Sequence, residues 1–250
     1  MYRTREVVRA LAAAMLVLAA FTLGGCEGAA PTSVEMLKYQ PKLLLSLPDM
    51  CNTPDGTTLD DQTGIIYLSC PNFNDANYPA VMMKITPDNK LMPLCVLPVR
   101  DDTKIDGPMG VDIGPDGNLY VADNQYFADP KGKSRLLRIN MKDGRATGVD
   151  VVVDGMNLAN AVIWRGDRVY VSDTFFDLKG EYGAGGIWCF KMDELKKGPV
   201  KVGPVDKDPH VLVKINAIEG RGSGNAGPDG LTFDGEGNLY HVVTISKDAD

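Results

Sequence analysis

Three short oxygen-bearing side chains occupy corresponding positions in a pattern that this sequence repeats. They are Asp55, Asn160 and Asp229, and Met109 stands at the same place in a further copy. Carboxylate and amide oxygens are ligands that Ca²⁺ prefers, and Mg²⁺ or Mn²⁺ would also accept them. If the fold brings the copies together, Asp55, Asn160 and Asp229 are candidate metal ligands. Asp229 is also the candidate catalytic base.

The repeat itself predicts a β-hairpin. Its clearest copies are residues 107–123 and 228–240, and looser copies lie at 54–69 and 158–173. Each copy has two alternating or β-branched runs separated by a turn, as hairpins do. The second run carries a tyrosine, and Tyr67, Tyr120 and Tyr170 are 53 and 50 residues apart. About 50 residues hold four short strands, which is the size of a propeller blade.

Further apolar runs supply the rest of each blade. Third strands are expected at 80–85, 134–139 and 186–191, and fourth strands at 91–97, 147–153 and 211–215. The insertion 193–208 is rich in Lys, Gly, Pro and Asp, so we expect a surface loop there. The sequence therefore predicts an all-β chain of the six-bladed β-propeller type. The innermost strands of a propeller line a central channel, and that would place the four corresponding positions on one ring.

Only about three and a half blades fit into this chain. The fourth copy is followed by the last residue, Asp250, and the apolar run 42–47 precedes the first blade without a partner. A half blade leaves an unpaired sheet edge, which native proteins avoid. We therefore expect a fragment that lacks roughly 100 to 150 residues of the complete propeller. The alternative is an unusual fold that ends here.

The hairpins at 158–164 and 228–233 resemble the SMP-30/gluconolactonase/LRE-like family, which is related to NHL propellers. The resemblance covers about residues 45–250. It implies a six-bladed propeller with one divalent metal, held by a Glu in blade one, an Asn in blade three and an Asp in blade four. These positions correspond to Asp55, Asn160 and Asp229. Asp55 is one methylene shorter than the family Glu, and the thioether of Met109 argues against the organophosphatase-like subgroup.

Structural interpretations of the same residues stay open. Pro-Asp-Gly also occurs in propellers that bind no metal, where the Asp caps a turn. Asp123 and Asp173, at the ends of two tyrosine strands, are expected to stabilise turns. For His241 a packed, hydrogen-bonded side chain is favoured over a catalytic base.

The first residues read as an export signal. Arg3, Arg5 and Arg9 precede the apolar stretch 11–23, and Cys26 follows two glycines, which resembles a bacterial lipoprotein signal. We expect a signal peptide at 1–25, a lipidated Cys26 with a flexible tether to residue 41, and a propeller domain at 42–250. The domain would then sit in the bacterial cell envelope, on the periplasmic or extracellular face. It would contact the membrane through its lipid only. The alternative is an ordinary secretory signal.

Charge and cysteine content narrow the partners. Of 26 basic and 33 acidic residues, three Arg and one Glu lie in 1–25, which leaves 23 and 32 in the mature chain. This acidity disfavours nucleic acid as a partner. An exported chain can form disulfides, and Cys51 and Cys70 lie at neighbouring strand ends in the expected hairpin. They are the first pair to test, with buried free thiols as the alternative.

Two functions follow from these observations. The first is a lipid-anchored, divalent-metal-dependent hydrolase of lactones or esters, similar to gluconolactonases, with calcium as the expected cofactor. The metal would polarise the substrate carbonyl, and Asp229 would accept a proton from the attacking water. The alternative is a non-catalytic NHL-like propeller that binds a protein or glycan. A shift of the melting temperature with Ca²⁺ distinguishes them.

Overall fold

The computed structural model describes residues 41–75, 77–129, 131–176, 185–215 and 227–243. The structural unit that carries the sheets spans Leu45–Asp250. The expected signal peptide at 1–25 and the lipidation site at Cys26 lie outside the described residues. Among those residues, no helix combines the length and the apolar character needed to cross a membrane.

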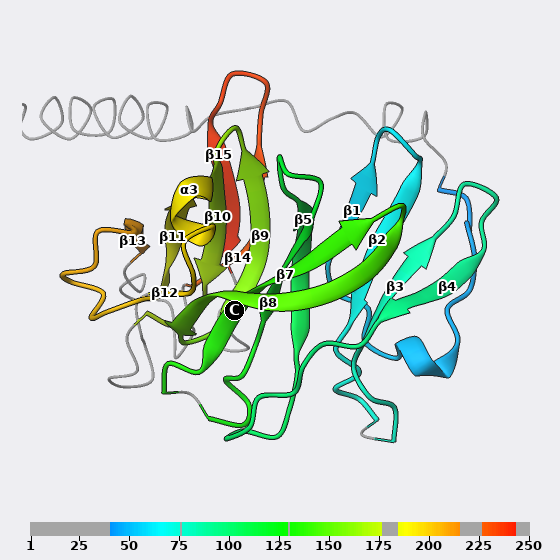
Figure 1. The fold of residues 1–250 in the computed structure, drawn as a ribbon, viewed down its shortest axis with the longest axis horizontal. Coiled ribbons are helices and arrows are strands. Elements are labelled where there is room, and N and C mark those ends of the chain that lie inside the picture. Colours follow the sequence, from blue (N-terminus) through cyan, green and yellow to red (C-terminus); the bar gives the residue numbers. More distant parts are fainter. Residues whose placement is uncertain (1–40, 76, 130, 177–184, 216–226, 244–250) are drawn as a thin grey trace, which may run out of the picture. The chain divides into compact units, whose positions relative to one another are not determined.

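The chain folds into consecutive antiparallel sheets, which confirms the all-β prediction and the blade-like order of its strands (Figure 1). A 3₁₀ turn, η1 (Asp49–Cys51), precedes the first sheet. The first sheet contains β1 (Thr57–Asp60), β2 (Ile65–Cys70), β3 (Val81–Ile85) and β4 (Leu91–Cys95). The second contains β5 (Pro108–Ile113), β6 (Leu119–Asp123), β7 (Ser134–Lys142) and β8 (Arg145–Met156). The third contains β9 (Ala159–Arg165), β10 (Arg168–Asp173), β11 (Gly185–Lys191) and β13 (Val211–Ile215), and a hairpin of β14 (Pro228–Phe233) and β15 (Leu239–Val243) follows.

In two of the four hairpins the repeated tyrosine is hydrogen-bonded to the turn of its own hairpin. The hydroxyl of Tyr120 donates to the carboxylate of Asp116 at 3.1 Å, and Tyr240 donates to Asp234 at 3.0 Å. The Asp234 carboxylate also accepts backbone N–H groups of the turn. Gly237 supplies the positive φ of +100° that this turn needs. In these two hairpins the recurring Tyr and Asp therefore belong to one local hydrogen-bonded turn.

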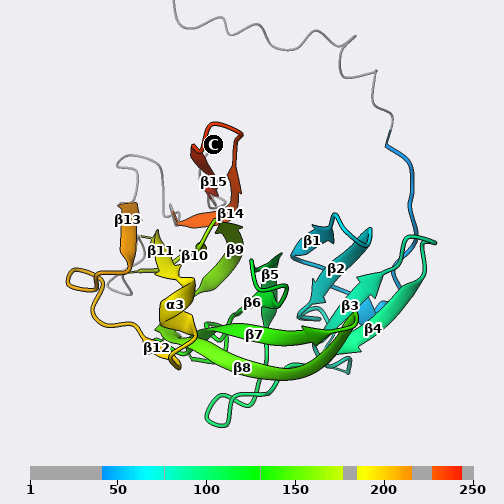
Figure 2. The same cartoon turned by 45° about the horizontal axis from the view of Figure 1, so that its top comes forward.

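The first strands of successive sheets, β1, β5, β9 and β14, lie next to one another in sequence order (Figure 2). Their backbones approach closely. A Cβ on Gly56 would lie 2.6 Å from Gly110 Cα, and a Cβ on Gly110 would lie 2.6 Å from Ala161 Cα. Glycine is required at both positions because no side chain fits between the strands.

The core fills the space between neighbouring sheets. One cluster joins the first and second sheets around Tyr67, Leu119, Val121 and Leu137. A larger cluster joins the second and third sheets and contains Trp188 and Phe190, both almost fully buried. Because apolar burial is the main stabilising contribution to folding, this packing sets the positions of the inner strands.

The insertion 193–208 differs from the expected surface loop. Its first three residues belong to a short helix, α3 (Met192–Leu195), and it also contains β12 (Val200–Lys201). β12 pairs in parallel with β8 of the preceding sheet, with Val200 opposite Val153. The Lys, Gly and Pro content obscured this strand, which is only two residues long and depends on a partner distant in sequence. The run 42–47 forms no regular secondary structure.

Candidate functional site

The four corresponding positions lie together at the starts of the inner strands. Asp55 precedes β1 by two residues, and Met109, Asn160 and Asp229 are the second residues of β5, β9 and β14. The close approach of Gly56 to the backbone of Met109, and of Gly110 to that of Asn160, places successive members side by side. We call Asp55, Asn160 and Asp229 the inner-strand site.

Two buried serines fix this arrangement. Ser172 Oγ accepts a hydrogen bond from the backbone N–H of Ala161 at 2.8 Å and donates to the carbonyl oxygen of Asp229 at 2.7 Å. Ser69 makes the equivalent two contacts two sheets earlier, with the N–H of Gly56 and the carbonyl of Met109. Each serine therefore joins two neighbouring inner strands. This role was not predicted from the sequence, although both serines stand two residues after a repeat tyrosine.

The two carboxylates of the inner-strand site influence each other. The surrounding protein, and then the negative charge of Asp229, raise the pKa of Asp55 to about 6. Asp55 itself is exposed to solvent. Its carboxylate is nevertheless surrounded by many protein atoms, which reduce its hydration and so disfavour the charged form. Asn160 is only 9% exposed, yet its side-chain amide makes no hydrogen bond within the described part of the chain.

These properties fit a hard cation. Two neighbouring carboxylates are held at a cost that a positive charge would relieve, and both are oxygen ligands, as is the amide oxygen of Asn160. Within the described residues, no group of three or more His, Cys, Asp or Glu side chains could hold a metal. A third protein ligand at this site would therefore be the amide oxygen of Asn160. Met109 packs against the core between the second and third sheets, so its thioether is a packing group.

Two buried aspartates hold the backbone just before the inner strands. Asp173 accepts from the N–H groups of Asn157 and Leu158 at 2.9 and 2.8 Å and from the Trp188 indole at 3.1 Å. Burial raises its pKa. Asp123 accepts from Gly107 N–H at 2.8 Å. Both therefore stabilise the chain segments that lead into β9 and β5.

Asp123 also forms a buried ion pair. The guanidinium Nε of Arg135 lies 2.6 Å from a carboxylate oxygen of Asp123, and the two side chains are 7% and 0% exposed. Gln125 donates to both oxygens of the same carboxylate at 2.9 Å. This network was not foreseen, because Arg135 and Gln125 carry no repeated signal.

Asp112 connects three sheets. Its carboxylate accepts from Thr58 Oγ1 at 3.0 Å and from the backbone N–H groups of Ile113 and Trp164 at 2.8 and 2.7 Å. Burial raises its pKa, and these three hydrogen bonds oppose that rise. Asp112 is therefore a structural carboxylate, and it stands three residues after Met109 in the repeat.

In the first sheet, Cys70 occupies the position of Asp123 and Asp173. Cys51, which belongs to η1, lies in the same apolar cluster as Cys70, and both residues are buried. Burial, reinforced by Cys51, raises the pKa of the Cys70 thiol to about 12. Both cysteines are free thiols in this structure. The sulfur atoms are thus neighbours, and the pairing stays a prediction.

His241 differs from the expected packed histidine. It is exposed on β15, opposite Leu231 of β14. The alternating pattern placed it on an inner hairpin, but this hairpin presents that position to solvent.

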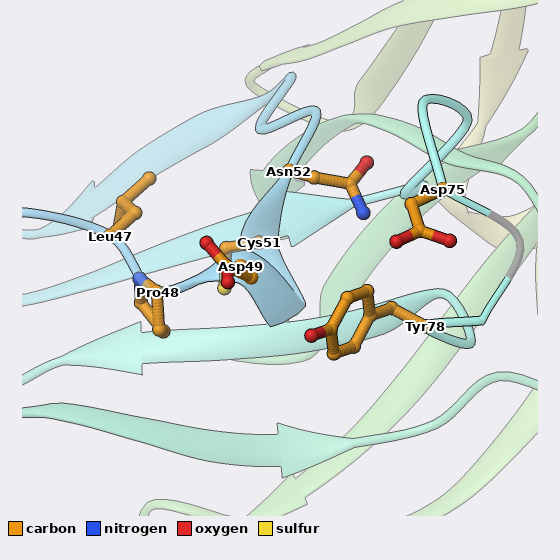
Figure 3. Close-up of a pocket in the computed structure, with 7 residues that line it drawn as sticks. All are labelled: Leu47, Pro48, Asp49, Cys51, Asn52, Asp75 and Tyr78. Atoms are coloured by element: carbon orange, nitrogen blue, oxygen red, sulfur yellow. The ribbon is translucent and has the colours of Figure 1, made fainter.

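A cavity of about 330 Å³ lies beside η1, apart from the inner-strand site (Figure 3). Its lining comprises Leu47, Pro48, Asp49, Cys51, Asn52, Asp75 and Tyr78. Figure 3 shows the Asn52 amide nitrogen turned toward the space between Asp75 and Tyr78, and this buried nitrogen has no hydrogen-bond partner among the described residues. None of the predicted metal ligands lines this cavity.

A scan against models of protein families gives no match, and a search of curated proteins gives none either. Among solved structures, the chain is similar to a gluconolactonase of Xanthomonas campestris, with 15% identity and a TM-score of 0.48 over 77% of this chain and 55% of that one. It is also similar to a periplasmic gluconolactonase of Pseudomonas aeruginosa, with 15% identity and a TM-score of 0.48 over 76% and 50%. A luciferin-regenerating enzyme matches with 14% identity and a TM-score of 0.42 over 76% and 68%. The chain spans about half the length of the two gluconolactonases.

Proposed function

We propose that the chain is a divalent-cation-dependent hydrolase of lactones or esters whose centre is the inner-strand site. The observation that carries the proposal is the electrostatic interaction between Asp55 and Asp229, which stand at the same position of the repeat as Asn160. Structural carboxylates in this chain, such as Asp173, are satisfied by several N–H donors. Among the described residues no such set of N–H donors reaches the Asp55 carboxylate, and a second carboxylate, Asp229, lies beside it, so Asp55 is a functional candidate.

Each residue of the site has a proposed role. Asp55, Asn160 and Asp229 would hold a cation, with Ca²⁺ as the first candidate because all three offer oxygen. When bound, the cation would supply Lewis-acid polarisation of the substrate carbonyl. Asp229 would accept a proton from the attacking water. Ser172 acts through its neighbours, because it holds the backbone of Asp229 against that of Ala161.

Hydrolysis of a simple lactone tests the proposal. We expect turnover that a chelator abolishes and added Ca²⁺ restores. Asp229→Asn should lose at least about a hundredfold in rate, the scale of a lost proton-transfer group. Asn160→Ala should also lose turnover, because it removes a proposed ligand of the cation. Asp61→Asn is the matched control, since Asp61 is exposed. Turnover that survives both site variants would reject the hydrolase. A folded chain without turnover or a calcium-induced melting shift would favour the non-catalytic propeller.

The export signal is a second part of the proposal. We propose that residues 1–25 direct the chain to the cell envelope, that the chain is cut there before Cys26, and that the thiol of Cys26 is lipidated. Metabolic labelling with a radioactive fatty acid should mark the wild-type chain and leave Cys26→Ala unlabelled. A Cys26→Ala chain that stays in the membrane fraction would contradict the anchor.

A further inference from the structure

Four aromatic side chains form a continuous row across the first three sheets. Phe73 contacts Phe127 edge to face with ring centroids 5.4 Å apart, and Phe127 contacts Tyr126 at 6.0 Å. Tyr126 stacks on Phe175 at 4.8 Å with 22° between the planes. All four follow the second strands of their sheets, β2, β6 and β10. We call Phe73, Phe127, Tyr126 and Phe175 the aromatic row.

Two members of the row are exposed, and Tyr126 and Phe175 are half-buried. Phe127 is 68% exposed and Phe73 is 44% exposed. The adjacent Phe176, by contrast, is 5% exposed and packs on Trp188 with centroids 4.8 Å apart. Contact between large aromatic rings and water is unfavourable, and exposed apolar patches commonly mark binding surfaces.

Hydrogen bonds join the row to the starts of the inner strands. Thr174, the neighbour of Phe175, donates from Oγ1 to the carbonyl of Pro228 at 3.0 Å, directly before Asp229. The carbonyl of Phe175 accepts from the side-chain amide of Asn157 at 2.7 Å, three residues before Asn160.

The middle of the row is fixed in the same way. The N–H of Asn124 donates to the carbonyl of Gly107 at 2.7 Å, two residues before Met109. The side-chain oxygen of Asn124 accepts from the N–H of Tyr126 at 2.8 Å and so sets the position of that ring. A Cβ on Gly107 would lie 3.4 Å from the ring of Phe73. The row and the inner-strand site therefore lie at the same end of the strands.

We propose that the aromatic row is a subsite that binds an aromatic ring of the substrate. This inference rests on the proposed function, and it names the substrate class as neutral lactones or esters that carry an aryl group. Ring centroids in the row are spaced as aromatic pairs prefer, so an aryl group placed on Phe127 would extend the same packing. The net charge of −7 favours a neutral ligand over an anionic one.

Two lactones that differ only by a fused benzene ring, dihydrocoumarin and δ-valerolactone, provide the test. Phe127→Ala should raise KM for dihydrocoumarin roughly tenfold, the scale of one lost aromatic contact, and by several-fold more than KM for δ-valerolactone. Because Phe127 is largely exposed, the variant should have the same melting temperature as the wild type. Leu212→Ala, an exposed apolar residue on β13, is the control and should change neither KM. An equal change for both lactones would overturn the subsite.

A binding measurement separates this inference from the hydrolase itself. Chroman and tetrahydropyran are the ether counterparts of the two lactones and cannot be hydrolysed. In saturation-transfer NMR, chroman should receive signal from the wild-type chain and lose most of it with Phe127→Ala. Tetrahydropyran should receive little. This outcome would support the subsite even if no lactone were hydrolysed. Chroman that receives no signal from the wild-type chain, or the same signal from both chains, would refute it.

Discussion

Removal of the Ser172 hydroxyl should loosen the contact between β9 and β14. In Ser172→Ala, the N–H of Ala161 loses its acceptor at 2.8 Å and the carbonyl of Asp229 loses its donor at 2.7 Å. Ser172 is fully buried, so water does not readily replace the hydroxyl. A buried backbone group left without a partner costs about 1–3 kcal/mol. Some relaxation of the strands is expected, and we predict a total loss of about 2 kcal/mol.

Thermal unfolding measures this loss. For a chain of this size, 1 kcal/mol corresponds to about 2–4 °C in Tm, so Ser172→Ala should melt about 4–8 °C below the wild type. Ser69→Ala should lose a similar amount, because Ser69 makes the equivalent contacts. Ser46→Ala is the matched control, since Ser46 is exposed. If Ser172→Ala melted together with Ser46→Ala, the idea that these serines join the inner strands would be wrong.

Three further predictions concern charge and sulfur. Because the pKa of Asp55 is raised from 3.8 to about 6 in the folded chain, protonation of Asp55 favours the folded state. This contribution to stability is fully present below about pH 3.8 and is lost as the pH rises through about 6. Ca²⁺ competes with that proton, so its melting shift should be larger at about pH 7.5 than at about pH 5, and equal shifts would disprove the coupling. Refolding with reduced and oxidised glutathione should join Cys51 to Cys70 in a disulfide, which should raise the free energy of unfolding by about 3 kcal/mol. Peptide mass spectrometry that finds both cysteines alkylated would exclude the disulfide. Arg135→Met leaves the buried Asp123 carboxylate without its cation and should lower the free energy of unfolding, measured with denaturant, by about 3–5 kcal/mol. Lys90→Met breaks the exposed ion pair with Asp88 and should leave that free energy unchanged. Equal effects of the two substitutions would contradict the buried network.

The repeat accounts for most of what the sequence predicted about the fold. Alternation around a turn of Asp and Gly identifies the hairpins because the same residues make the local hydrogen bonds, as Tyr120 and Asp116 do. Aligning the hairpins then placed Asp55, Asn160 and Asp229 at corresponding positions. Side-by-side inner strands turn that correspondence in sequence into proximity in space.

Features that depend on one particular partner were not foreseen. β12 has two residues and exists because β8 offers an edge, so no local pattern could announce it. Asp112 looked like any strand residue, although it receives hydrogen bonds from two neighbouring sheets. The aromatic row was also missed. Its members follow three different strands, and only the packing of the loops brings their rings into contact.

Calcium titration by calorimetry tests the central claim most directly. The wild-type chain should bind one Ca²⁺ at about pH 7.5. Asn160→Ala should bind far more weakly, because it removes the only amide of the inner-strand site, while Asp61→Asn should match the wild type. Binding of Ca²⁺ by Asn160→Ala with wild-type affinity, or no binding by a folded wild-type chain, would contradict the account.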